Sequence, residues 1–422
     1  SALQRHKRQS LKSLARSRGD RKDISYTWVV QKRILKIICL YYNSQINWEL
    51  LLFDKKMKFN KNFSGRRNFI KKSALGVGLL SSLSSFEIFS QSQRIQSSTS
   101  DRLHLKMAGY DYQRVSALFE GKVAIEGCTF EIEKSGIGIM NTIAFDGPQT
   151  YDVSEIGIVP FIIAYANQDF RDYYLLPVFP LRMFRHKSVF IRTDGPIKSP
   201  LDLKGKKIGT TGYSSSSLTW IRGMMQDEYG ISPADVEWVL ARKDSSADVS
   251  GKASKQEQVL PEGLKMSYGT PGMDESDLLV NGEVDALFHA VQPKAFVKGD
   301  PKVGRLFSDS RKVEQDYYAK TGIFPIMHSV AVRKSLLDKE PGLAQSLFKA
   351  YSESKTMNYN YMSKLGWAYD TLPWYGQEHE DTKRAMGANF WPYGMDANRK
   401  TLETICRYCF EQGFIKKQIN YE

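Results

Sequence analysis

The chain has 422 residues, of which 41% are hydrophobic. This length exceeds one ordinary domain, and the apolar fraction is large enough for real cores, which excludes an intrinsically disordered chain. The formal net charge of +14 lies in residues 1–91, which hold 19 of the 60 Lys and Arg and five of the 46 Asp and Glu. The remaining residues are therefore neutral, and the basic charge is no evidence for nucleic-acid binding.

The first methionine, Met57, begins a segment with the anatomy of an export signal. Basic residues are followed by a short apolar run at 74–83 and by small residues at 90–92, the order found in secretory signal peptides. In the run SGRRNFIK at 64–71, the Arg pair is followed by Phe and Lys, which resembles a twin-arginine signal. We therefore predict a periplasmic protein that is exported by the twin-arginine route.

Residues 1–56 precede that methionine and are rich in Lys and Arg. We interpret them as a non-native or upstream extension, with a genuine basic extension as the alternative. The apolar run at 74–83 is about half of the roughly 18–20 residues that a membrane anchor needs. No stable membrane insertion of the mature chain is therefore expected.

After the leader, short apolar runs typical of strands alternate with helical patterns. The first strand-like run, 103–108, stops at Gly109, and further strands are predicted at 129–133, 153–158, 174–178, 188–192, 207–210, 236–240 and 284–288. Helices are predicted at 217–229, with Gly230 as the C-cap, and at 335–361, interrupted at Pro341. This alternation predicts an α/β fold with mainly parallel sheets.

Turns and composition divide the chain into two lobes. A new α/β unit opens after the turn at 194–196, and a second crossing between the lobes is expected within 306–330. The polar stretch 243–263 is interpreted as a surface excursion of the second lobe. The predicted boundaries are 1–56 for the extension, 57–91 for the signal peptide, 92–102 for a linker, 103–192 for the first part of lobe 1, 193–306 for lobe 2, and 307–422 for the return to lobe 1 and the C-terminal helices.

Cysteines and histidines give no strong metal motif. Cys406 and Cys409 form a C-x-x-C in an apparently helical segment, without a second Cys pair or a nearby His. We interpret them as two cysteines on a helix face, with a redox or metal site as the alternative. No metal and no cofactor are predicted, but a divalent ion held by separated residues such as Glu155, His186 and His328 is left open.

Several short blocks of sequence occur in a recognisable order. LDLKGKKIG at 201–209, a Ser-rich turn, a helix and NGEVDA at 281–286 are similar to the type II periplasmic-binding-protein fold. Further blocks resemble the 4,5-dihydroxyphthalate decarboxylase family: FPLRMFRH at 179–186, WIRG at 220–223, DEYG at 227–230, GIFPIMH at 322–328 and FWPYG at 390–394. The resemblance implies a two-lobed fold and decarboxylation of an aromatic dicarboxylate, although many members of the family look like solute-binding proteins.

Such a decarboxylation needs a proton donor to the ring carbon and cations that orient carboxylates. His186, His289 and His328 follow or close apolar runs, where α/β folds place their ligands, so we predict them as catalytic residues in a shared cleft. A structural role at a strand end is the alternative for each. His186 and His328 are the preferred candidates for the donor.

Carboxylate recognition favours arginine, because its planar guanidinium can donate two parallel hydrogen bonds. The turn 210–217 offers hydroxyls and helix-start amides to an anion, and aromatic rings can stack on an aromatic ligand. The predicted substrate-binding residues are Arg114, Arg182, Arg185, Arg222, Tyr213, Ser214, Ser215, Trp220 and Phe324. Surface solvation, ion pairing, helix capping or core packing is the alternative for each. No phosphate-loop or dinucleotide motif occurs, so no nucleotide is predicted.

Two functions follow from these observations. The sequence blocks favour a decarboxylase, cofactor-independent or metal-assisted, that acts on a hydroxylated aromatic carboxylate between the lobes. The export signal favours a solute-binding protein that presents an organic carboxylate to a membrane permease. Both hypotheses predict a small anionic aromatic carboxylate as the partner and no nucleic acid.

Overall fold

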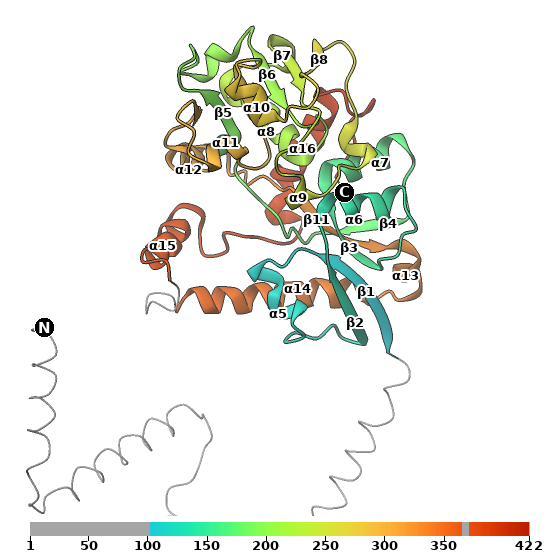
Figure 1. Ribbon diagram of the computed structural model, residues 1–422. Coiled ribbons are helices and arrows are strands. Elements are labelled where there is room, and N and C mark those ends of the chain that lie inside the picture. The colour runs from blue at the N-terminus through green and yellow to red at the C-terminus, as the bar shows by residue number, and fades with distance from the viewer. Residues whose placement is uncertain (1–101, 365–370, 422) are drawn as a thin grey trace, which may run out of the picture. The chain divides into compact units, whose positions relative to one another are not determined.

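The computed structural model describes residues 102–364 and 371–421 (Figure 1). The predicted extension and signal peptide, and all but the last residue of the predicted linker, lie outside these residues. The chain divides after Ser92 into two units, and the described residues belong to the second unit, Gln93–Glu422. That unit contains two mixed β-sheets.

The first sheet has the strand order β2-β1-β3-β11-β4. Its strands are β1 (Leu103–Gly109), β2 (Cys128–Lys134), β3 (Val153–Gly157), β4 (Tyr173–Leu176) and β11 (His328–Arg333). β1 is parallel to β2 and β3, whereas β11 runs antiparallel between β3 and β4. All strands but β11 therefore point the same way, and β11 joins them only after the chain has built the second sheet.

The second sheet has the order β10-β5-β9-β6-β7-β8. Its strands are β5 (Val189–Arg192), β6 (Lys207–Thr210), β7 (Glu237–Leu240), β8 (Met266–Tyr268), β9 (Ala286–Phe288) and β10 (Val303–Arg305). Here β5 is the single antiparallel strand, inserted between β9 and β10. The two sheets thus repeat one arrangement, which confirms a two-lobed type II fold with mainly parallel sheets.

One strand lies in a different sheet from the one that the sequence indicated. The predicted strand 188–192 was placed at the end of lobe 1, but β5 pairs within the second sheet. Its apolar side chains, Val189, Phe190 and Ile191, are buried in the cores around that sheet. An apolar run shows that a strand is buried, but it does not show against which sheet it packs, and this is why the boundary at residue 192 was set too late.

The two predicted helical segments are present. The predicted helix 217–229 is α8 (Ser216–Tyr229), which ends at Gly230 with a φ of 67°. The predicted interruption at Pro341 separates α13 (Lys334–Lys339) from α14 (Leu343–Met362). The other helices are α5 (Gln113–Phe119), α6 (Ile137–Phe145), α7 (Ile158–Asn167), α9 (Ala247–Ser250), α10 (Glu275–Val280), α11 (Lys294–Val297), α12 (Ser310–Thr321), α15 (Tyr375–Met386) and α16 (Arg399–Glu411).

The C-terminal helices cover both lobes. α14 packs beside α5 over the first sheet, whereas α16 packs against α7 and α8 (Figure 1). Cys406 and Cys409 lie on the buried side of α16 as free thiols, as predicted for cysteines on a helix face. Within the described ranges, none of the helices is long and apolar enough to cross a bilayer.

Candidate functional site

A histidine and a glutamate meet at the carboxyl end of β3. His328 begins β11 and lies opposite Gly157, the last residue of β3, in the antiparallel register. Its Nδ1 lies 2.6 Å from Oε1 of Glu155, and both residues are buried. Because a carboxylate oxygen accepts this hydrogen bond, Nδ1 carries the proton, and Nε2 is the ring nitrogen left for a ligand.

Two tyrosines that follow β1 complete the surroundings of Glu155. The hydroxyl of Tyr112 donates to Oε1 over 3.0 Å, and the backbone N–H of Tyr110 donates to Oε2 over 3.1 Å. Burial raises the pKa of Tyr112, and the negative charge of Glu155 raises it further, so the phenol stays a donor at neutral pH. The ring of Tyr110 stacks beside His328, with the ring centroids 6.0 Å apart. Glu155 and the His328 ring are thus held in one orientation.

Arg114 lies close to this pair, between two aromatic rings. Its guanidinium carbon is 4.1 Å from the centre of the Tyr112 ring and 4.0 Å from the centre of the Trp391 ring, and Nε donates to the carbonyl of Pro180. Burial lowers the pKa of Arg114. No carboxylate forms an ion pair with Arg114 in the part of the chain that the structure describes, so its positive charge is available to an anionic ligand.

A second arginine is held by hydrogen bonds to the second lobe. Arg185 donates through Nη1 to the carbonyl of Ala290 over 2.8 Å and through Nη2 to the hydroxyl of Ser217, at the start of α8. Ser217 in turn contacts the sulfur of Met327, the neighbour of His328. Burial lowers the pKa of Arg185. Arg185 has no carboxylate partner within the described ranges either, so the second lobe brings another unpaired cation towards the carboxyl end of β3.

The excursion 243–263 reaches the first lobe. A Cβ on Gly138, at the start of α6, would lie only 2.1 Å from the carbonyl oxygen of Lys252, so the two backbones are in close contact. The side chain of Asn141 accepts from the backbone N–H of Gly157 and donates to Glu257. The segment predicted as a surface excursion therefore packs beside the end of β3 and links the lobes.

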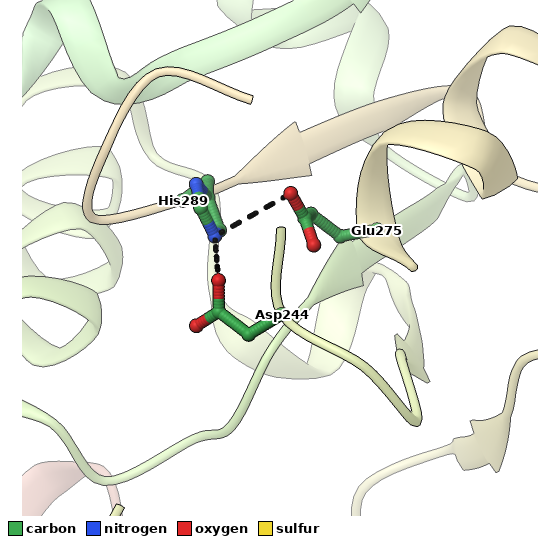
Figure 2. Close-up of side chains that lie close together, drawn as sticks. All are labelled: Asp244, Glu275 and His289. Carbon is green, nitrogen blue, oxygen red and sulfur yellow. Dashed lines mark ion pairs between the residues drawn. The ribbon is translucent and has the colours of Figure 1, made fainter. Parts of the chain in front are cut away.

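A third group of ionisable side chains lies in the second lobe, at the carboxyl end of β9 (Figure 2). Nε2 of His289 is 3.4 Å from Oδ1 of Asp244 and 3.8 Å from Oε1 of Glu275. His289 and Glu275 are buried almost completely, and Asp244 is partly exposed. Burial alone would raise the pKa of Asp244, but His289 and the Ser246 hydrogen bonds outweigh it and lower the pKa to about 2.

Sequence reasoning predicted His289 but missed its two carboxylate neighbours. Asp244 lies in the loop after β7, and Glu275 lies at the capped start of α10. The sequence at each position has the ordinary pattern of such a loop or helix start. Their position at the edge of the same sheet as His289 is the only signal that could have indicated the cluster.

The structure places His186 apart from the other two histidines. Its ring is enclosed by aromatic rings, including Phe307 at 5.3 Å and Tyr317 at 5.2 Å between centroids, and neither ring nitrogen has a hydrogen-bond partner. Burial lowers the pKa of His186 to about 4. A neutral imidazole in such a cage does not fit the proton donor that the sequence suggested, nor a metal ligand together with Glu155 and His328.

Three predicted substrate-binding residues belong to the core instead. Tyr213 is fully buried, and Arg222 stacks on its ring at 3.6 Å while donating to the side chain of Gln412. The indole N–H of Trp220 donates to the carbonyl of Ile326. Tyr213 and Trp220 belong to the hydrophobic core that includes residues of α8 and α16, and Arg222 is buried beside them. The expectation that they contact a ligand is therefore corrected.

The predicted serines have structural contacts, whereas their neighbours connect the lobes. The hydroxyl of Ser214 donates to the carbonyl of Gln256, and Ser215 caps the start of α8. Ser216, in the same predicted turn, accepts from the backbone N–H of Val159 in the first lobe. Ser217 contacts Met327, so Ser216 and Ser217 connect this turn to the first lobe and to the neighbour of His328.

Arg182 and Phe324 lie in the two segments that cross between the lobes, one between β4 and β5 and the other between α12 and β11. Arg182 donates through Nε and Nη2 to the carbonyl of Phe324 and through Nη1 to that of Pro392. Phe324 packs on the rings of Phe184 and Trp391, the latter also being the residue that stacks on Arg114. Both predicted residues therefore support the Arg114 region through packing and backbone contacts.

A hollow of about 300 Å³ lies elsewhere, between α12 and α15. Its lining includes Lys187, Arg311 and Glu314, but neither Glu155 nor His328. Arg311 already pairs with Glu378 and Asp381 across this hollow. The charge of Arg311 is thus satisfied within this hollow, whereas Arg114, beside the Glu155–His328 pair, has no carboxylate partner among the described residues, so the chemistry favours that pair as the site.

Comparison with known proteins identifies the family. The chain is 31% identical over 322 residues to 4,5-dihydroxyphthalate decarboxylase from Comamonas testosteroni, which covers 75% of this chain and 94% of that protein. The chain belongs to the 4,5-dihydroxyphthalate decarboxylase family. A second member, 4,5-dihydroxyphthalate decarboxylase from Pseudomonas putida, is 30% identical over 218 residues, which cover 52% of this chain and 82% of that protein. The family described as "NMT1/THI5 like" matches residues 182–256.

Solved structures with similar folds include proteins of other functions. The periplasmic aliphatic sulphonate-binding protein from Escherichia coli has a TM-score of 0.43 and 15% identity, and the match covers 76% of this chain and 90% of that one. A desulfurization enzyme has a TM-score of 0.41 and 15% identity, with 75% and 94% covered. One of these two similar structures is thus a binding protein, and the other is an enzyme.

Proposed function

We propose that the chain decarboxylates a hydroxylated aromatic dicarboxylate, with 4,5-dihydroxyphthalate as the first candidate. The observation that carries the proposal is the buried hydrogen bond between Glu155 and His328, beside the unpaired charge of Arg114. Two relatives named 4,5-dihydroxyphthalate decarboxylase support it from the side of the sequence.

The chemistry requires a proton for the ring carbon that loses CO₂. When the bond between the ring and the carboxylate breaks, CO₂ leaves and the bonding electron pair stays on the ring carbon. His328, protonated on both nitrogens, gives its Nε2 proton to that carbon, and Glu155 stabilises the imidazolium through Nδ1 before the transfer. Water then returns a proton to Nε2, so that one proton is consumed for each CO₂ released.

Cations and aromatic rings would hold the substrate. Arg114 has no carboxylate partner among the described residues, and its guanidinium is fixed by Tyr112 and Trp391, so it is suited to bind the carboxylate that remains on the ring. Arg185 approaches from the second lobe and could bind the other end of the substrate. Tyr110, already stacked near His328, offers an aromatic face to the ring.

The alternative is an exported protein that binds such a carboxylate and delivers it to a membrane permease. The observation that favours it is the segment 57–91, with its Arg pair and apolar run, because a twin-arginine signal would place the chain in the periplasm. The same arginines would hold the ligand in both cases, and the two functions differ in whether His328 transfers a proton.

The test measures turnover and binding together. The purified chain is mixed with 4,5-dihydroxyphthalate, and the release of CO₂ and the heat of binding are recorded on the same preparation. We expect CO₂ release together with formation of the dihydroxybenzoate. Binding heat without CO₂ would reject the enzyme and support the binding protein, and the absence of both would reject this ligand for either function.

A further inference from the structure

We propose that Asp244, Glu275 and His289 bind a divalent first-row transition ion, of the class of Mn²⁺ or Zn²⁺. The three side chains come from separate elements of the second lobe: the loop after β7, the first turn of α10 and the end of β9 (Figure 2). Each can offer one ligand atom, and the three atoms lie within 4.8 Å of one another. The inference holds whether the chain is an enzyme or a binding protein.

The tautomer of His289 is the first argument. Its Nδ1 lies 2.7 Å from the carbonyl oxygen of Val291, which can only accept, so Nδ1 carries a hydrogen. In the neutral ring, Nε2 then has a lone pair. A backbone carbonyl that fixes Nδ1–H in this way is the usual partner of a histidine that binds a metal through Nε2.

The surroundings of Nε2 are the second argument. This buried nitrogen makes no hydrogen bond, and it faces Asp244 and Glu275 at 3.4 and 3.8 Å, which is long for a hydrogen bond. Burial lowers the pKa of His289, but the charges of Glu275 and Asp244 outweigh burial and raise it, so the cluster favours a positive charge between its members. Either a proton on Nε2 or a bound cation can supply that charge. Since metal–ligand bonds are about 2.0–2.2 Å long, two ligand atoms on one ion lie about 3–4 Å apart, which is close to these separations.

Among the described residues, no lysine or arginine forms an ion pair with Asp244 or Glu275. The nearby Lys294 places its Nζ 2.5 Å from Asp274 and 2.8 Å from Asp277, outside the cluster. Within the described ranges, the imidazole of His289 is thus the group able to carry a positive charge that these two carboxylates share. A divalent ion would neutralise both carboxylates, which is a larger gain than one proton on the ring can give.

Other contacts already orient the carboxylates. The backbone N–H of Ser245 donates to Oε2 of Glu275 over 2.9 Å, and both the backbone N–H and the hydroxyl of Ser246 donate to Oδ1 of Asp244. Such outer contacts fix first ligands before an ion arrives. One nitrogen and two oxygens suit Mn²⁺ or Zn²⁺ better than Ca²⁺ or Mg²⁺, which prefer oxygen ligands only. Three protein ligands also leave a position for water or for a bound molecule.

Metal binding to the full chain tests the proposal directly. After dialysis against a chelator, Mn²⁺ or Zn²⁺ is titrated by calorimetry, and the bound metal is counted by mass spectrometry after gel filtration. We expect about one ion per chain and a Tm that rises with the ion concentration. His289→Gln and Glu275→Gln should abolish both effects, whereas the matched variant His104→Gln, of an exposed histidine on β1, should keep them.

A folded protein without the ion would overturn the proposal. The proposal is overturned if the wild-type chain binds neither ion at micromolar concentration. Protons on both ring nitrogens of His289 at neutral pH, seen in its nitrogen NMR signals, would then identify the cluster as an ion pair of an imidazolium with two carboxylates. This measurement uses the wild-type chain, so it does not depend on the folding of the variants. It also does not depend on CO₂ release, so its outcome is separate from that of the proposed activity.

Discussion

Glu155 on β3 and His328 on β11 form a diagonal pair across two antiparallel strands. In the register, Glu155 lies opposite Val330, and His328 lies opposite Gly157, so the two residues are displaced by two positions. Long side chains can bridge this diagonal, and Oε1 and Nδ1 meet at 2.6 Å. Because the two strands are separated by the whole second sheet in sequence, the pair forms only when the chain returns to the first lobe.

The first prediction concerns this pair. We expect His328→Asn to lower kcat by about 100-fold or more, because the ring carbon loses its proton donor, while KM changes much less. Glu155→Gln should also lower kcat, since a neutral amide stabilises the imidazolium of His328 less than a carboxylate does. Steady-state assays of CO₂ release measure both constants. His104→Asn is the control, and an equal loss of affinity and turnover in His328→Asn would contradict a role in proton transfer.

The second prediction concerns Arg114. Arg114→Lys keeps the positive charge but loses the planar group that stacks between Tyr112 and Trp391. We expect a KM that is about tenfold higher, with a smaller change in kcat, because a carboxylate contact that is equally present before and during reaction affects binding. Arg171→Lys is a matched control, since Arg171 stacks on Tyr165 at 3.5 Å on another part of the first lobe. An unchanged KM in Arg114→Lys would remove Arg114 from the substrate site.

The third prediction concerns pH and His186. Burial lowers the pKa of this histidine from 6.5 to about 4, so between these values the unfolded chain binds a proton that the folded chain does not. The free energy of unfolding should therefore fall as the pH drops from 6.5 to 4, by up to about 3 kcal/mol from this group alone. His186→Leu should remove that part of the pH dependence. Urea unfolding at several pH values measures it, and identical slopes in both proteins would show that His186 does not cause it.

The fourth prediction concerns the contact between α8 and α16. A Cβ on Gly223 would lie 2.2 Å from ring atoms of Tyr408, which is buried and cannot move away easily. We expect Gly223→Ala to lower the free energy of unfolding by about 1–3 kcal/mol through overpacking. Gly342→Ala is the control, because a Cβ there meets no atom within 4 Å. Urea denaturation compares the two variants, and equal stability would mean that the helices can separate at little cost.

The sequence predicted much of the secondary structure because its signals are local. The apolar run at 207–210 became β6, and the serines before 217–229 together with Gly230 mark the start and the end of α8. The assignment of β5 to the first lobe was wrong, since burial is visible in a run of apolar residues but the partner strand is not.

The candidate site was only partly predictable for the same reason. His328 and Arg114 were selected from their positions after or near strand ends, and the structure places both around Glu155. His186, in the same sequence block as Arg185, points instead into an aromatic cage. Neighbouring residues of a loop can face opposite directions, and no periodicity indicates which of them faces the ligand.

By itself, the sequence determined eight of the eleven strands in the described residues, the helical segments at 216–229 and 334–362, and the resemblance to the family, because these depend on local patterns and on blocks that keep their order along the chain. Only the tertiary structure decided which ionisable groups meet. Glu155 and His328 lie on strands that are separated in sequence by the whole second sheet, and Asp244, Glu275 and His289 come from three separate elements of the second lobe. The distances between such groups, which set their electrostatic interactions, exist only once both sheets have formed.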